Sequence, residues 1–318
     1  MISVILCTYN RSAMLREALA TLAAQTANGE IDWELLVVDN NSSDDTRQVV
    51  EAFAAEQSGF SVRYLFEGRQ GKSHALNTGV AAAHGDIIAF TDDDVYVHPD
   101  WIREIDKAFR TLPCTGIGGR VRPLWRQPQP SWLVLTGPNR LRMAIMQFEH
   151  GDTPRPLTGV ALVGCNMAFR REAFEKYGLF RADLGPTPDS LLRGEDTEFS
   201  QRLAKHGEPL YYVPDAIVDH PVEEKRATKS YYLSWYFDFG RTSARMGNIP
   251  RDGRRMFGVP LYLIRALVVN AFKWWVTLAP VARFKRKLET AEALGRVVEA
   301  RRLLAEPADH VQPRPSAS

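Results

Sequence analysis

The chain has 318 residues, of which 45% are hydrophobic and 25% are charged, as is typical of globular proteins. Its 40 Lys and Arg against 38 Asp and Glu give a net charge of +2, which excludes a strong basic excess, so we expect no nucleic-acid partner. Three widely spaced cysteines, Cys7, Cys114 and Cys165, exclude a disulfide framework and a zinc site, and they fit a reducing compartment. The first residues, MISVILCTYN, lack the basic segment and long apolar run of a secretory signal, so we expect none.

The charge is distributed unevenly along the chain. From Arg251 to the end there are 13 Lys and Arg and 6 Asp and Glu, a balance of +7. The first 250 residues therefore hold 27 basic and 32 acidic groups, a balance of −5. We expect an acidic body that performs chemistry and a basic tail that contacts an anionic surface.

Apolar runs alternate with helical patterns in the first 110 residues. The runs predict buried strands at 2–7, 33–38, 62–66 and 87–90. Helical patterns follow each run: one through Leu15, Leu19 and Leu22, one opened by Asp44 and Asp45 and continuing to Phe53, and two more at 71–83 and 99–110. This alternation is typical of an α/β fold with a parallel sheet covered by helices on both faces.

The remaining segments are less regular. We expect strands near 117–121, 166–169, 210–213 and 216–218, helices up to Tyr177 and over 195–206, an irregular region at 123–160 and a loop at 186–193. From Ala227 onward the sequence is helical, basic and aromatic, and 307–318 is expected to be disordered. The predicted domains are thus 1–225, a helical extension at 226–306, and the tail.

Acidic residues follow the fourth predicted strand as Asp92, Asp93 and Asp94. Because side chains alternate along a strand, Asp92 and Asp94 point the same way, at the edge where open parallel sheets bind ligands. No Lys or Arg lies close in the sequence, so the two carboxylates repel each other unless a cation joins them. Oxygen ligands favour Mg²⁺ or Mn²⁺, which can stabilise a departing diphosphate. The alternative is a solvated acidic turn.

Polar residues also end the first two strands. Thr8, Tyr9 and Asn10 supply a hydroxyl, a ring and an amide, and Asp39 can accept a hydrogen bond from a base or a ribose. Asp39 could instead be a turn or cap residue. Three polar strand ends at one sheet edge indicate a ligand site.

A third acidic element is Glu195–Asp196, at the start of a predicted helix. Carboxylates are electrostatically favoured there, so an ordinary N-terminal acid pair is one interpretation. The functional interpretation is a general base.

Six segments occur in an order that identifies a family. They are ISVILCTYNR, VVDNNSSDDT, GKSHALNTGV, GDIIAFTDDDV, GCNMAFRREAF and GEDTEFSQRL. Together they resemble the family 2 glycosyltransferases over about residues 1–220. The resemblance implies the GT-A fold, a mainly parallel mixed sheet between helices, and transfer of a sugar from a nucleotide-diphosphate-sugar to an acceptor hydroxyl with inversion.

The resemblance also implies roles for single residues. Nucleotide-sugar-binding positions are matched by Thr8, Tyr9, Asn10, Asp39, Lys72, Asn77, Asp92 and Asp93, and the floor of the sugar pocket by Gly164 and Asn166. Asp196 matches the catalytic base and Glu195 its neighbour. The metal, Mg²⁺ or Mn²⁺, would be held by Asp94 and Asp92, with His220 as a third ligand or else a packed histidine.

Other functions were weighed against this one. A sugar-phosphate nucleotidylyltransferase needs a Gly-rich loop with Arg where the sequence has CTYNRSAM. An aspartyl phosphatase usually has Thr or Val where Tyr96 stands. A non-catalytic nucleotide-sugar-binding protein is a further alternative. The Gln-x-x-Arg-Trp motif of processive synthases is absent after Asp196, so we expect the addition of a single sugar.

The segment 261–279 is long enough to span a bilayer, but it carries Arg265 and Lys273. Each charge costs about 2.5–3.5 kcal/mol near the centre of a span. At helical spacing both charges fall on one side of the helix and most apolar residues on the other. This arrangement favours a helix that lies in the membrane interface. The alternatives are a helix packed on the domain or on a partner subunit, and a true span. The aromatic segment 230–245 forms an acceptor-side wall or a packed helix, and 288–304 a further amphipathic helix.

The tail thus predicts a protein on the cytoplasmic, inner face of the cell membrane with a glycan or lipid-linked acceptor. The residues do not select the base, the sugar, the linkage or an oligomeric state.

Overall fold

The computed structural model describes residues 1–141, 143–187, 192–247, 249 and 254–305. The predicted loop at 186–193 lies partly outside these residues, and the predicted disordered tail at 307–318 lies wholly outside them. The chain forms two compact units. Unit 1 contains the chain up to Leu124 and most of it from Met146 to Pro221, and unit 2 contains Trp125–Ile145 and the chain from Val222 onward.

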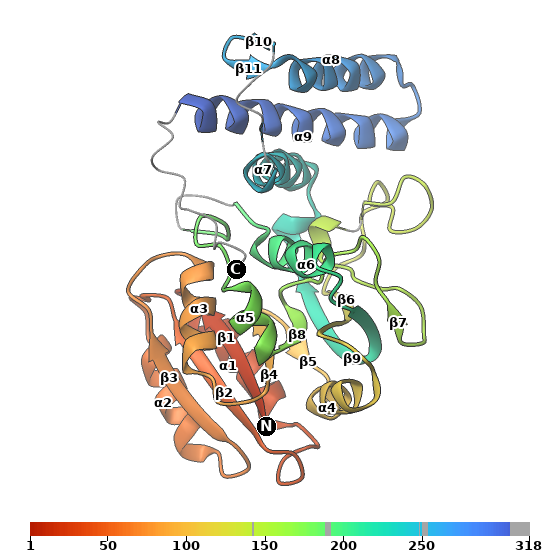
Figure 1. The fold of residues 1–318 in the computed structure, drawn as a ribbon. Coiled ribbons are helices and arrows are strands. Elements are labelled where there is room, and N and C mark those ends of the chain that lie inside the picture. The colour runs from red at the N-terminus through yellow and green to blue at the C-terminus, as the bar shows by residue number, and fades with distance from the viewer. Residues whose placement is uncertain (142, 188–191, 248, 250–253, 306–318) are drawn as a thin grey trace. The chain divides into compact units, whose positions relative to one another are not determined.

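Unit 1 is built on a mixed sheet, which has nine strands in the described part of the chain (Figure 1). The strands are β1 (Ile2–Thr8), β2 (Trp33–Asp39), β3 (Ser61–Phe66), β4 (Ile87–Asp92), β5 (Tyr96–Val97), β6 (Gly116–Trp125), β7 (Arg155–Pro156), β8 (Asn166–Arg170) and β9 (Leu210–Val222). Their order is β3-β2-β1-β4-β8-β6-β9-β5, with β7 beside β9. The first four in this order are parallel, and β8 is antiparallel to both β4 and β6. The predicted mixed α/β sheet is confirmed.

Helices cover both faces of this sheet. They are α1 (Ser12–Ala23), α2 (Thr46–Glu56), α3 (Lys72–Ala82), α4 (Trp101–Thr111), α5 (Arg171–Tyr177) and α6 (Glu195–Lys205). Alternate residues of β1 belong to different apolar clusters: Val4 and Leu6 pack with residues of α1, α2 and α4, whereas Ile5 and Cys7 pack with residues of α3, α5 and α6. This alternation explains why the strand is apolar throughout.

One continuous strand in unit 1 takes the place of two strands that the sequence predicted. The sequence suggested separate strands at 210–213 and 216–218, but β9 runs without a break from Leu210 to Val222. Pro214 lies between the two predicted segments. Its fixed φ is compatible with extended backbone, and the strand continues because it pairs with β7 near Tyr212 and with β5 at Val218.

Unit 2 is mainly helical. It contains α7 (Lys229–Met246), α8 (Leu261–Val276), α9 (Pro280–Ala305), the 3₁₀ turns η1 (Met143–Ile145) and η2 (Glu224–Ala227), and a hairpin of β10 (Arg255–Met256) and β11 (Val259–Pro260). Helices α8 and α9 run side by side in Figure 1. The hairpin was not predicted, because its strands have two residues each and give no periodic pattern. Within the described residues, we find no helix with the length and apolar character that crossing a membrane requires.

Candidate functional site

Three strand ends meet at one edge of the sheet in unit 1. The parallel register places Thr8 beside Asp39 and Cys7 beside Asp92. The polar residues that follow β1, β2 and β4 are therefore neighbours, as the sequence predicted, because parallel strands end at a common edge.

Two cationic side chains pair with the carboxylates of the Asp92–Asp94 triplet. The guanidinium of Arg11 donates to Asp93 at 3.0 Å and to Asp94 at 3.3 Å, and the ammonium group of Lys72 donates to Asp92 at 2.5 Å. The expectation that no Lys or Arg lies near these carboxylates is wrong. Arg11 and Lys72 are far from the triplet along the chain, and only the pairing of β1 with β4 and the packing of α3 bring them to it.

Asp93 is the most enclosed carboxyl group of the triplet, at 4% exposure. Burial raises the pKa of Asp93 to about 6, with a further contribution from the charge of Asp94, while Arg11 and a 2.8 Å hydrogen bond from Thr8 act in the opposite direction. The three carboxylates of the triplet pair with two cationic side chains, Arg11 and Lys72, which favours binding of a further cation.

Lys72 is aimed at the triplet by the loop before α3. The side chain of Asn40 at the end of β2 donates to the carbonyl groups of Glu67 and Arg69 and accepts from the amide of Gly71. Gly71 has a φ of +133°, a conformation that other residues rarely adopt. Burial lowers the pKa of Lys72, but the charges of Asp92 and Glu195 raise it by more, so the ammonium stays protonated.

Asp39 is held in place at the end of β2. One of its carboxyl oxygens accepts from the amide of Ser42 at 2.9 Å and the other from the hydroxyl of Tyr64 at 2.8 Å. Burial and the hydrogen bond to Asp39 raise the pKa of Tyr64 to about 12. Asn10, with a φ of +50°, accepts from the amide of Ser43, so the loops after β1 and β2 are joined. Tyr9 is 37% exposed and presents its ring at this edge.

Glu195 is an enclosed carboxyl group at the start of α6. It is 5% exposed, and its Oε2 atom has no hydrogen-bond partner among the described residues. Burial and the neighbouring charge of Asp196 raise its pKa to about 7, while the charge of Lys72 opposes the shift. Because Lys72 acts on both Glu195 and Asp92, the helix-borne acids and the strand-end acids share one electrostatic site.

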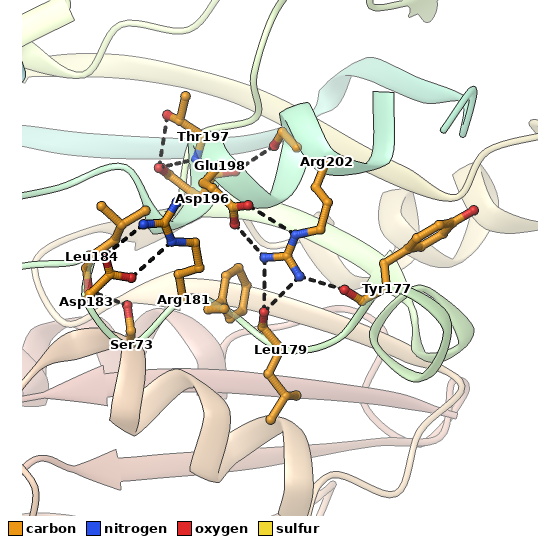
Figure 2. A network of polar contacts seen from close by, with 12 residues as sticks. Ser73, Tyr177, Leu179, Arg181, Asp183, Leu184, Asp196, Thr197, Glu198 and Arg202 are labelled. Atoms are coloured by element: carbon orange, nitrogen blue, oxygen red, sulfur yellow. Dashed lines mark hydrogen bonds and ion pairs between the residues drawn. The ribbon is translucent and has the colours of Figure 1, made fainter. Parts of the chain in front are cut away.

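Asp196 is oriented by backbone amides. Its Oδ1 accepts from the amide of Thr197 at 2.6 Å (Figure 2). Its Oδ2 accepts from the amide of Gly164 at 2.8 Å. The buried hydroxyl of Ser200 donates to the carbonyl of Asp196 and accepts from the amide of Leu162, which ties the segment containing Gly164 to the first turn of α6.

The rest of α6 is anchored by one arginine. Arg202 pairs with Glu198 one turn earlier and donates to the carbonyl oxygens of Tyr177 at 2.6 Å and Leu179 at 3.1 Å (Figure 2). The helix is therefore fixed to the end of α5, so the carboxylate of Asp196 has a defined position.

His220, near the end of β9, lies beside the triplet. Its Nε2 is 3.7 Å from Asp94 Oδ1, and its Nδ1 is 3.1 Å from the carbonyl of Pro221. An imidazole that donates from Nδ1 to a carbonyl presents the lone pair of Nε2, as metal-ligating histidines do.

Within the described residues, no group of three or more His, Cys, Asp and Glu side chains is arranged to hold a metal ion. Mg²⁺ often has only one or two protein carboxylates, with substrate phosphates and water completing its shell. The Asp94–His220 pair, next to Asp92 and Asp93, fits a site of this kind for Mg²⁺ or Mn²⁺.

Two predicted binding residues have structural partners. The amide of Asn77 donates to and accepts from the backbone of Phe180. Asn166 accepts from the indole of Trp101 and donates to the carbonyl oxygens of Arg120 and Ala216. Both side chains therefore hold the walls of the site together.

Sequence reasoning assigned no role to Arg11, Asn40 or Ser200. Arg11 stands next to the polar residues that end β1, and this adjacency was the available signal. Asn40 directly follows Asp39 and has the character of an ordinary turn residue, and Ser200 carries no signal of its own because its partners are backbone groups.

Comparison with known proteins agrees with this geometry. Residues 3–178 match the model of the family described as glycosyl transferase family 2. The chain is 30% identical over 243 residues to the succinoglycan biosynthesis protein ExoM of Rhizobium meliloti, covering 76% of this chain and 73% of that protein. It is 26% identical over 268 residues to the glycosyltransferase AglE of Haloferax volcanii, covering 83% and 80%.

Solved structures show the same fold. The mannosyltransferase PcManGT of Pyrobaculum calidifontis, solved in complex with GDP-Man and Mn²⁺, superposes with a TM-score of 0.57 at 21% identity, covering 94% of this chain and 73% of that one. The fold is of the GT-A type. The family match spans more than half of the chain, and the chain belongs to glycosyltransferase family 2.

Proposed function

We propose that this enzyme transfers a single sugar from a nucleotide-diphosphate-sugar to an acceptor hydroxyl with inversion at the anomeric carbon. One observation carries the proposal: the carboxylate of Asp196 is held by the amide of Gly164, two residues before Asn166, and Asn166 pairs with Thr91 next to the acidic strand end at Asp92–Asp94. This arrangement supplies a base and a leaving-group site together, which is what direct displacement requires.

Asp196 is the proposed base. With its carboxylate held by the amides of Gly164 and Thr197, it takes the proton of the acceptor hydroxyl as that oxygen attacks the anomeric carbon. The sugar–phosphate bond breaks on the opposite side, so the configuration inverts. No enzyme nucleophile is needed, and burial raises the pKa of the nearby Cys7 and Cys165, which keeps these thiols protonated.

The donor is proposed to bind across the strand ends. Asp39, Tyr9, Thr8 and Asn10 would meet the base and ribose, while Lys72 and Arg11 face the diphosphate. Asp94, Asp92 and His220 would hold Mg²⁺ or Mn²⁺, which supplies positive charge for the departing diphosphate. The remaining predicted positions shape or line the sugar pocket: Asn77, Asp93, Gly164, Asn166 and Glu195.

The proposed acceptor is a glycan, including one linked to a lipid at the cytoplasmic face of the cell membrane. The succinoglycan biosynthesis protein to which the chain is similar supports a polysaccharide acceptor. The basic, aromatic residues of α8 and its flanks support a position at a membrane. A single addition is supported by the lack of a Gln-x-x-Arg-Trp sequence after Asp196.

The released product tests the proposal. The full chain is incubated with Mn²⁺ and a set of UDP-, GDP- and dTDP-sugars, and the phosphate-containing products are separated. We expect release of a nucleoside diphosphate from one donor, increased by a glycan acceptor. In parallel incubations, release of pyrophosphate from a nucleoside triphosphate with a sugar 1-phosphate would instead indicate a nucleotidylyltransferase, and release of inorganic phosphate from a sugar phosphate would indicate a phosphatase.

A further inference from the structure

Helix α8 is apolar on two faces, and only one of them is covered within unit 2. Leu263, Ile264 and Val259 form a cluster with Val297 and Ala300 of α9. The opposite side, here called the α8 outer face, consists of Leu261, Val268, Val269, Phe272, Trp275 and Val276. Phe272 is 60% and Trp275 72% exposed. The sequence predicted one apolar side that includes Leu263, Ile264, Val268 and Trp275. The structure packs the first two and exposes the last two, together with four apolar residues that the sequence had not placed on that side.

The β10–β11 hairpin adds an exposed aromatic side chain at the start of α8. Its two-residue turn consists of Phe257, with a φ of +53°, and Gly258, with a φ of +79°. Phe257 is 82% exposed. A bulky residue with positive φ at a turn is unusual, and core packing does not account for it here.

The charge around this surface has one sign. Residues 254–288 contain eight Lys and Arg and no Asp or Glu. Arg265 and Lys273 are exposed on α8 itself, and Arg254 and Arg255 adjoin the hairpin turn. Lys287 of α9 lies over the ring of Trp274, 5.7 Å from its centroid.

We propose that the α8 outer face and the Phe257 turn form one docking surface for an anionic lipid bilayer. Apolar side chains enter the boundary between headgroups and acyl chains, while the long stems of Arg265 and Lys273 let their charges reach the phosphates. Each basic group near an anionic membrane contributes about 1 kcal/mol.

This charge pattern selects lipid over a second copy of the chain. In a symmetric dimer through the α8 outer face, the exposed Arg265 and Lys273 of one copy would approach those of the other, and like charges would repel across the interface. An anionic bilayer satisfies both the positive charge and the exposed aromatic residues. The proposal rests on the membrane position proposed above and names the surface that would provide it, and it does not depend on the transfer reaction.

Vesicle binding tests the proposal with the full chain. The probes are vesicles of phosphatidylcholine with 30% phosphatidylglycerol and vesicles of phosphatidylcholine alone, in co-sedimentation without donor or acceptor. We expect binding to the anionic vesicles that weakens as salt is raised. Phe272→Ser with Trp275→Ser should lower the partition coefficient about a hundredfold, and Arg265→Gln with Lys273→Gln about tenfold or more.

A matched variant controls for loss of exposed apolar area. Leu294→Ser with Val298→Ser removes side chains of α9 that are 43% and 45% exposed and lie outside the docking surface, so vesicle binding should not change. Circular dichroism, recorded before and during heating, reports whether each variant folds. The product assay shows whether the proposed transfer reaction is wrong, and sedimentation shows whether the proposed docking surface is wrong. The two failures are therefore distinguishable.

Three outcomes overturn the proposal. The first is that the folded chain does not sediment with anionic vesicles at low salt. The second is that the wild type and the Phe272/Trp275 variant bind equally. The third is that light scattering shows a dimer which those substitutions dissociate and vesicles leave intact. The last outcome identifies a second copy as the occupant.

Discussion

Glu195 makes the stability of the folded chain depend on pH. Its pKa of about 7 lies above the ordinary value of 4.5, because burial and the charge of Asp196 disfavour its ionised form. The stability that the protonated group provides is therefore complete below about pH 4.5 and is lost as the pH rises through 7. We predict that Glu195→Gln, which stays neutral, is more stable than the wild type at pH 8 by up to about 3 kcal/mol and gains much less at pH 5.5.

Urea unfolding at pH 5.5 and pH 8 measures this difference. Glu208 is the matched control, since hydrogen bonds from Thr115 and Tyr177 lower its pKa to about 2. Glu208 is ionised in both the folded and the unfolded chain between pH 5.5 and pH 8, so Glu208→Gln should destabilise the fold equally at both pH values. If the extra stability of Glu195→Gln over the wild type does not increase with pH, the raised pKa of Glu195 is contradicted.

Asp196 is predicted to affect turnover and not donor binding. Loss of a general base lowers rates by about 10²–10⁴-fold, so Asp196→Asn should lower kcat by that factor while the donor Kd stays within about twofold. Steady-state kinetics and calorimetry measure the two quantities. The control is Asp183→Asn, an acid of unit 1 that is paired with Arg181 and is expected to leave kcat unchanged. Near wild-type turnover by Asp196→Asn would remove Asp196 from the proposed role.

Asp94 is predicted to couple metal and nucleotide binding. A ligand at a hundred times its Kd stabilises a protein by about 2.7 kcal/mol, so Mn²⁺ should enlarge the thermal shift caused by a nucleoside diphosphate. In Asp94→Ala, the part of the thermal shift that depends on Mn²⁺ should be lost, and a smaller shift caused by the nucleotide alone should remain. Asp86→Ala removes one exposed charge at the opposite end of β4, and its shift should match that of the wild type. An unchanged Mn²⁺ effect in Asp94→Ala would exclude this residue as a ligand.

At the scale of elements, helices α7 and α9 meet through two glycines. A Cβ on Gly240 would lie 1.9 Å from the carbonyl oxygen of Glu292, and one on Gly295 would lie 2.0 Å from that of Phe237. Nearby, Glu299 has no exposed area and pairs with Arg241 and Arg245. This approach of two backbones leaves no room for a side chain.

Gly240→Ala is therefore predicted to destabilise the chain. In an ordinary helix this change raises the free energy of unfolding by about 1 kcal/mol. Here the two helices must separate to make room for the methyl group, so we expect a net decrease in the free energy of unfolding of about 2 kcal/mol or more. Denaturant unfolding measures the change. Gly68→Ala is the control, because the nearest atom to its Cβ is a ring carbon of Phe66 at 3.5 Å. A stabilised Gly240→Ala variant would show that the crossing is looser than the structure indicates.

The elements that sequence predicted best are those that repeat a local pattern over several residues. The strands β1 to β4 and the helices between them match the predicted segments within a few residues, because burial on both faces makes whole strands apolar. The single strand β9 and the β10–β11 hairpin were missed, since a proline and two-residue strands carry little periodic information.

At the scale of the whole molecule, the apolar clusters respect the division into two units. Two clusters lie entirely in unit 1 and two in unit 2. Each unit therefore has a core of its own, which is the condition for separate unfolding.

We predict two transitions in differential scanning calorimetry. A nucleoside diphosphate with Mn²⁺ should raise the Tm of the transition that belongs to unit 1, because every proposed donor residue lies there. Gly240→Ala should lower the other Tm. A single transition that moves as a whole with nucleotide would show that the units unfold together.

The sequence by itself determined the family, the parallel core of the sheet and the set of polar residues at its edge. These properties follow from local order: the alternation of apolar runs, and the rule that parallel strands end at one edge. Only the tertiary structure decided which charges pair. Arg11 and Lys72 reach Asp92–Asp94, Glu195 is kept from water, and the apolar residues of α8 divide between packing and exposure. Those outcomes depend on contacts between residues far apart in the chain, and no local pattern encodes them.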